Sequence, residues 1–77
     1  MSAEKKSQPL FGTEYPYVDE WVQGDGWIEI GYDYNTKSFI RVLDEGGMIW
    51  SGRARYTSVD EALAEANGAI ETWWVEN

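Results

Sequence analysis

The sequence contains no cysteine and no histidine among its 77 residues. The lack of cysteine excludes disulfides, iron–sulfur clusters and thiol catalysis, and the lack of histidine leaves only carboxylates as strong metal ligands. Zinc sites and nucleophilic triads are therefore excluded. Because a secreted domain of this size normally carries disulfides, their absence favours a reducing compartment, and we expect a cytoplasmic protein of bacterial type.

Basic residues are scarce and unevenly placed. Six Lys and Arg against 14 Asp and Glu give a formal net charge of −8, and residues 7–36 and 56–77 contain no base at all. Such an acidic chain repels phosphates, so we expect no direct binding to nucleic acid. In the simpler interpretation the charge keeps the protein in solution. In the other it attracts a basic partner, as a nucleic-acid mimic would.

Long apolar runs are missing as well. No stretch approaches the roughly 20 apolar residues that a membrane span requires, and no apolar signal core follows the polar residues 1–9. We therefore expect no membrane partner, a disordered lead over residues 1–9 and a single domain over residues 10–77. Five Trp, five Tyr and two Phe supply the dense packing that so short a domain needs.

Three segments have the pattern of strands. Residues 27–34 alternate apolar and polar side chains, and residues 38–43 and 48–56 follow turns that contain Asn, Asp and Gly. They predict a three-stranded antiparallel β-meander, because each turn is too short for any other connection.

The register of the first hairpin decides which side chains share a face. We expect Tyr34 to lie opposite Ser38, which puts Ile30 opposite Val42. One face of the sheet then collects the apolar side chains Ile28, Ile30, Tyr32, Ile40, Val42 and Ile49.

The opposite face of this sheet is not the polar surface that a solvated face requires. We expect Arg41 to lie across from Trp50 in a cation–π contact on this face. The favoured cover is the irregular, aromatic segment over residues 10–22, and the alternative cover is a second protein. The face carries Trp27, Glu29, Phe39, Arg41, Leu43, Met48 and Trp50, and the covering side chains are Leu10, Phe11, Tyr15, Tyr17 and Trp21.

The C-terminal region predicts one amphipathic helix. Residues 58–61 (Ser-Val-Asp-Glu) have the form of a capping box, in which hydroxyl and carboxylate each accept a free backbone N–H. Gly68 lies inside the helix, where it predicts a close backbone contact, and Trp74 is expected to be more exposed than Trp73. The apolar stripe consists of Val59, Ala62, Leu63, Ala66, Ala69, Ile70 and Trp73.

The fold class that follows is α+β. We expect a three-stranded antiparallel meander packed against one C-terminal helix, preceded by an irregular N-terminal segment with at most one helical turn after Pro16.

No motif predicts catalysis or cofactor binding. Gly24-Asp25-Gly26 precedes a strand, whereas a dinucleotide loop follows one. The acids from Asp33 to Asp44 lack the glycine of a calcium loop, and adjacent acids on strands point apart. We therefore expect no enzyme, no cofactor and no metal site, with a carboxylate-only metal protein or enzyme as the competing class.

Two resemblances concern overlapping parts of the chain. Ser51-Gly52, residues 57–63 (Thr-Ser-Val-Asp-Glu-Ala-Leu) and residues 69–71 (Ala-Ile-Glu) resemble the HicB-like antitoxin module, over roughly Trp27 to Val75. The resemblance implies a short antiparallel sheet followed by a capped helix, and an antitoxin role. Residues 11–33 resemble small uncharacterised proteins of cyanobacteria and related bacteria.

Together these features predict a small, acidic, non-enzymatic protein-binding or regulatory module that is a monomer or a weak homodimer. One alternative is a nucleic-acid mimic that inhibits a basic partner. The other is a metal-binding protein or enzyme whose site consists of carboxylates alone. Aromatic residues, Met and Arg are enriched at the centres of protein interfaces. The candidate partner-binding residues are Trp27, Phe39, Arg41, Met48, Trp50 and Trp74.

Overall fold

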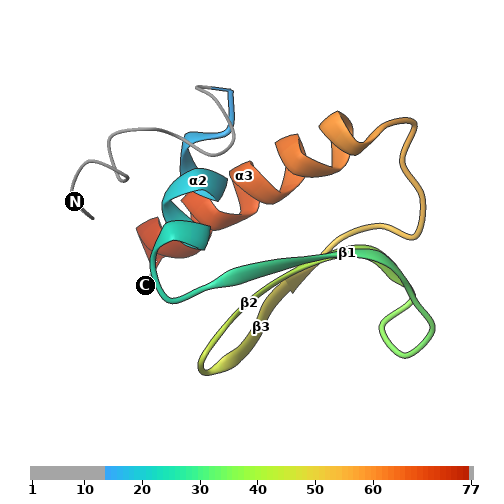
Figure 1. The fold of residues 1–77 in the computed structure, drawn as a ribbon, viewed down its shortest axis with the longest axis horizontal. Coiled ribbons are helices and arrows are strands. Elements are labelled where there is room, and N and C mark those ends of the chain that lie inside the picture. The colour runs from blue at the N-terminus through green and yellow to red at the C-terminus, as the bar shows by residue number, and fades with distance from the viewer. Residues whose placement is uncertain (1–13, 77) are drawn as a thin grey trace.

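The computed structural model describes residues 14–76 and confirms the α+β meander (Figure 1). The lead over residues 1–9 and the expected covering residues Leu10 and Phe11 lie outside the described residues. The elements in chain order are α2 (Pro16–Gln23), β1 (Trp27–Asp33), β2 (Ser38–Asp44), β3 (Gly47–Ser51) and α3 (Val59–Glu76).

The molecule has two layers, a sheet of order β1-β2-β3 and a layer formed by α2 and α3 on one side of it (Figure 1). Helix α3 contacts β2 and β3, while the shorter α2 packs on α3 and touches β1. The alanines of α3 let this helix approach the sheet closely. The core between the layers consists of Val18, Trp21, Ile40, Val42, Ala62, Leu63, Ala66 and Ile70.

The pairing of β1 with β2 differs by two residues from the expected register. Ile30 lies opposite Ile40, and Ile28 opposite Val42. Because side chains alternate with a period of two, this shift keeps Ile28 and Ile30 on the face that meets the helices. The sequence therefore predicted correctly which face Ile28 and Ile30 share, but not the residues that lie opposite them.

The turn and a β-bulge together cause the shift, because Asp33 and not Tyr34 lies opposite Ser38 and the bulge then adds one more residue. Gly31 and Tyr32 together oppose Phe39, and Gly31 has a φ of 127°, which favours glycine. Strand β1 ends at Asp33, one residue before the expected end. Tyr32, expected in the apolar face, is exposed and lies with its ring against Tyr34.

A second bulge changes the face of one tryptophan. Trp50 lies opposite Val42 and Met48 opposite Leu43, so Ile49 is an extra residue in β3. Trp50 therefore shares the helix-facing side with Val42. The expectation that Trp50 belongs to the opposite face was wrong, because one inserted residue reverses the alternation on one side of it.

The segment before β1 is a helix and not the expected irregular stretch. Pro16 begins α2, where its missing N–H costs nothing, and the next N–H groups are capped from another helix. The Oδ1 atom of Asn67 in α3 accepts the N–H groups of Tyr17 at 2.8 Å and of Val18 at 3.1 Å. This contact is remote in sequence, so the local pattern did not reveal the helix.

Helix α2 also overturns the expected cover of the second sheet face. Val18 and Trp21 belong to the core, and the hydroxyl of Tyr15 donates to the carbonyl of Asp60 in α3 at 3.2 Å. The ring of Tyr17 lies 6.0 Å from that of Trp74. The aromatic residues of this segment that the structure describes therefore pack on α3 and do not cover the far face.

The start of α3 follows the predicted cap with one variation. The Oγ atom of Ser58 accepts the N–H of Glu61 at 3.1 Å, while the carboxylate of Glu61 accepts the N–H of Thr57 at 2.8 Å. The connection from β3 is fastened to the same helix, because Tyr56 donates its hydroxyl to Glu65 at 2.9 Å and Arg53 lies 4.4 Å above the Tyr56 ring.

Replacing Asn67 tests the cap between the helices. Asn67→Ala removes the acceptor for two N–H groups of α2 and should lower the free energy of unfolding by about 0.5–2 kcal/mol in urea denaturation. Asn67→Asp keeps an acceptor oxygen and adds a negative charge at the N-terminus of α2, so it should remain close to the wild type. Equal losses in both variants would contradict the cap.

Replacing Gly68 tests whether another part of the chain lies close to this residue. The close contact expected at Gly68 is absent from the described structure, because a Cβ built there meets no atom within 4 Å. Gly68→Ala should therefore raise the free energy of unfolding by about 1 kcal/mol, and the melting temperature by several degrees. Ala64 is exposed in the same helix, so Ala64→Gly is the matched control and should lower the free energy of unfolding. A loss of stability in Gly68→Ala would show that the position is crowded.

Candidate functional site

The sheet face turned away from the helices carries a row of apolar side chains across all three strands. Trp27 of β1 lies opposite Leu43 of β2, which lies opposite Met48 of β3. Trp27 is 44% exposed and Met48 is 47% exposed. We call Trp27, Leu43 and Met48 the open-face row. Neither α2 nor α3 covers it, because both helices lie on the other side of the sheet.

The next position along this face is occupied by an ion pair in which the arginine is buried and the glutamate is about half exposed. Arg41 lies opposite Glu29 and opposite Ser51, and not opposite Trp50 as expected. Its Nε atom donates to Oε1 of Glu29 at 3.0 Å, and its side chain is only 9% exposed. The expected cation–π contact with Trp50 does not form, because the bulge in β3 places Trp50 on the opposite face.

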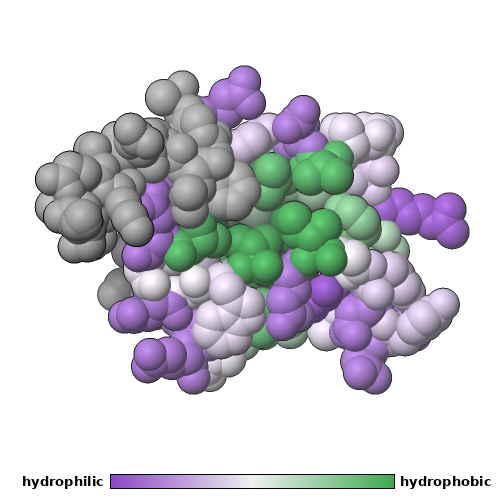
Figure 2. Space-filling view, viewed as in Figure 1, coloured by the Kyte–Doolittle hydropathy of each residue, from purple (hydrophilic) through white to green (hydrophobic). Residues whose placement is uncertain are grey.

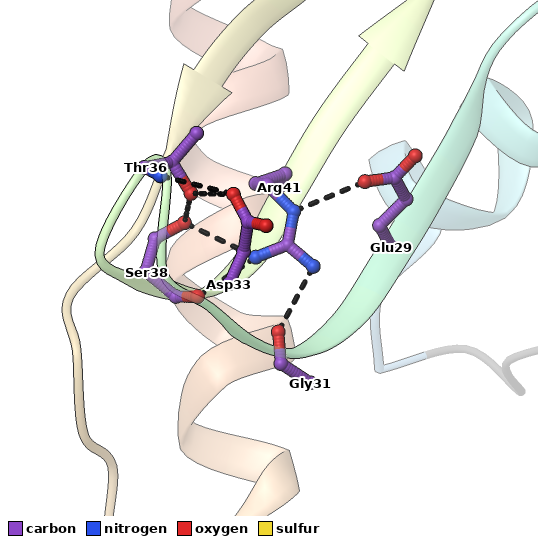
Figure 3. A network of polar contacts seen from close by, with 6 residues as sticks. All are labelled: Glu29, Gly31, Asp33, Thr36, Ser38 and Arg41. Atoms are coloured by element: carbon purple, nitrogen blue, oxygen red, sulfur yellow. Dashed lines mark hydrogen bonds and ion pairs between the residues drawn. The ribbon is translucent and has the colours of Figure 1, made fainter.

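The guanidinium of Arg41 fastens the first hairpin (Figure 3). One terminal nitrogen donates to the carbonyl of Ser38 at 2.7 Å and to its hydroxyl at 3.2 Å, and the other donates to the carbonyl of Gly31 at 2.9 Å. Gly31 belongs to the bulge, so the side chain ties the bulge to the start of β2. Every nitrogen of Arg41 already has a partner, and its role is therefore structural.

The remaining three candidate residues lie apart from the open-face row. Phe39 is half-buried, with its ring 6.0 Å from that of Tyr56. Trp50 is half-buried on the helix-facing side. Trp74 is 37% exposed near the end of α3, as expected, and packs against Trp21. Of the six candidates, the structure brings Trp27 and Met48 together and separates the others.

Sequence reasoning missed one exposed apolar residue. Ile30, expected in the core, is 49% exposed, because it lies on the edge strand β1 at the border of the helix layer. Figure 2 shows a band of apolar side chains at the surface between the helices and the sheet. Periodicity assigns a residue to a face, but it does not tell how far a short helix extends over that face.

The hairpin beside Arg41 also contains a shifted carboxyl. Asp33 accepts the N–H and the hydroxyl of Thr36, each at 2.9 Å. These two bonds, the backbone bond above all, hold the pKa of Asp33 below its ordinary value of 3.8, and the positive charge of Arg41 acts in the same direction. The charged form of Asp33 therefore stabilises the turn.

Comparisons with known proteins were made for the whole chain. A scan against protein-family models, a search of curated proteins and a search of solved structures each found no match. The resemblance to the HicB-like module therefore stays a prediction. Within residues 14–76, no group of three or more acidic side chains is placed to hold a metal ion, and no helix is long and apolar enough to cross a membrane.

The shifted pKa of Asp33 predicts a pH dependence. Because the pKa is lower in the folded chain than in the unfolded one, the carboxylate stabilises the fold above the unfolded value and loses this effect as the pH falls through the folded value. Asp33→Asn should therefore be less stable than the wild type above about pH 5, and the difference should shrink below about pH 3. Urea denaturation over a pH series measures it.

The control for this prediction removes the same charge from the other turn of the sheet. Glu45→Gln leaves the contacts of Asp33 intact and should follow the wild type in the acid range. If Asp33→Asn keeps a constant difference from the wild type at every pH, the charge of Asp33 does not stabilise the turn.

Proposed function

We propose that the protein is a small, non-enzymatic protein-binding module whose contact surface is the open-face row. The observation that supports this function is the position of Trp27 and Met48, which flank Leu43 on the face that neither helix covers. A regulator or inhibitor of this kind acts by covering the surface of its partner.

The side chains in the row are those that protein interfaces favour. Tryptophan and methionine are enriched in interfaces, and tryptophan is frequent among the few residues that carry most of the binding free energy. Full burial of an exposed side chain of this size contributes about 1.5–3 kcal/mol, and Trp27 and Met48, which are about half exposed, contribute roughly half of that each. The row also lies on strands, which hold its side chains at fixed spacing and lower the entropy that binding must remove.

The charge of the chain points to the kind of partner. A net charge of −8 favours a basic protein over a nucleic acid, whose phosphates it repels. We place this function in the cytoplasm, since a domain of 77 residues without cysteine suits a reducing compartment.

The test compares two double variants of the full-length chain. Trp27→Ser with Met48→Ser removes the exposed side chains of the row, while Tyr34→Ser with Val75→Ser removes two other exposed apolar side chains. Each tagged variant is incubated with an extract of the host cells, and the retained proteins are quantified by mass spectrometry. We expect a partner that the wild type and the control retain and that the row variant loses at least tenfold, as loss of two central contacts implies.

Two further measurements define what would contradict the proposal. Circular dichroism must show that all variants fold, and we expect the row variant to melt several degrees lower than the wild type because its side chains are about half buried. Equal retention by the row variant and the control would overturn the proposed surface. A concentration-dependent mass that the row variant abolishes would show that the row binds a second copy of the chain instead.

A further inference from the structure

The C-terminal ends of α2 and α3 meet at a cavity of about 210 Å³. The turn from α2 into β1 and the last residue of β2 complete its wall, at the end of the molecule where α3 ends (Figure 1). None of the described residues that line it is basic. Its side chains are three indoles and three carboxylates, from Trp21, Trp73, Trp74, Glu20, Asp25 and Asp44.

The charge around this cavity is negative for two independent reasons. The first is the three carboxylates. The second is the backbone, because the C-terminus of a helix carries a partial negative charge, and two helices end here with no basic residue in either last turn. The described parts of the two stretches without a base, residues 14–36 and 56–76, meet at this place in the fold.

The indoles are held in place before any ligand arrives. The Nε1 atom of Trp21 donates to the carbonyl of Leu43 at 2.8 Å, and its ring lies 5.7 Å from that of Trp73 and 5.5 Å from that of Trp74. Trp21 itself is 5% exposed. Indole rings attract cations more strongly than other aromatic side chains do, and fixed rings lose little entropy on binding.

We propose that this cavity binds one cationic side chain of a partner protein, arginine in preference to lysine. The carboxylates neutralise the charge, the helix ends add to the attraction, and the partly exposed indole of Trp74 offers a surface on which a planar guanidinium stacks. The cavity is smaller than the roughly 300–1,000 Å³ of sites for free small molecules, which suits a single side chain.

Other occupants fit this cavity less well. A metal ion needs carboxylates that converge on one point, and the acids of residues 14–76 form no such group. The exposed bases Lys37, Arg53 and Arg55 belong to the β1–β2 turn and the β3–α3 connection at the opposite end of the sheet (Figure 1), where Arg53 pairs with Glu65 at 2.9 Å.

The cavity adjoins the open-face row, and the inference deepens the proposed function on which it rests. Gly26 lines the cavity and precedes Trp27, while Asp44 lines it and follows Leu43. The row and the cavity therefore lie at the same end of the sheet, the row on the open face and the cavity on the helix side, so a partner reaches both by extending past the strand ends. The surface as a whole suits a segment that joins an apolar stretch to a base.

The experiment titrates the full-length protein with two capped tripeptides, acetyl-Gly-Arg-Gly-amide and the same peptide with citrulline. Citrulline has the shape of arginine without its charge. We expect saturable NMR shifts in the indole N–H signals of Trp73 and Trp74 and in the amides of Gly24 and Gly26 with the arginine peptide. The citrulline peptide should bind roughly tenfold more weakly. Equal binding of both peptides would overturn the proposal.

Matched variants separate the cavity from the general charge of the protein. Asp25→Asn with Asp44→Asn changes the net charge from −8 to −6 at the cavity, and Glu45→Gln with Glu71→Gln makes the same change at residues that do not line it. The first pair should weaken the arginine peptide roughly five- to tenfold and the second pair less than twofold. Equal weakening would show diffuse attraction and overturn the site.

Two outcomes identify what failed. If the arginine peptide binds only to the variant Lys5→Gln with Lys6→Gln, the chain's own lysines occupy the cavity in the wild type. That result would overturn the proposal that a partner's side chain binds there. If Asp25→Asn with Asp44→Asn still retains the partner captured through the open-face row, the cavity proposal fails and the protein-binding function stands.

Discussion

The indole of Trp21 is the contact on which the rest of the structure depends. Its N–H reaches the carbonyl of Leu43 in the central strand, and its ring packs on Trp73 of α3. Gly26 is required beside it, because a Cβ there would overlap the Trp21 ring. One side chain thus joins both helices to the sheet and directs the chain from α2 into β1. A domain this small has few such contacts to spare.

Two bulges decide what the free face of the sheet displays. The bulge at Gly31 is held by Arg41, whose charge is neutralised by Glu29, so a base that sequence reasoning offered to a partner is used inside the fold. The bulge at Ile49 turns Trp50 toward the helices. What remains exposed is a short apolar row at one end of the face, bordered by the ion pair of Arg41 and Glu29.

Basic and acidic side chains are concentrated at different ends of the molecule. Arg53 forms ion pairs with Glu61 at 3.2 Å and with Glu65 at 2.9 Å, which fasten the β3–α3 connection. At the other end, the helix termini and the acids around Trp73 and Trp74 have no base among the cavity's described lining. The acidic excess is therefore concentrated beside the aromatic side chains and the open-face row.

The sequence by itself determined the strands, the meander, the cap at Ser58 and the acidic, aromatic character of the surface, because alternation, turn residues and capping act over a few neighbouring residues. Only the tertiary structure decided that residues 16–23 form a helix, since its cap is Asn67, about 50 residues away. Bulges depend on cross-strand contacts such as that between Arg41 and Gly31. The faces of Trp50 and Tyr32, the burial of Arg41 and the cavity between two helix ends follow from such remote contacts, which no local pattern contains.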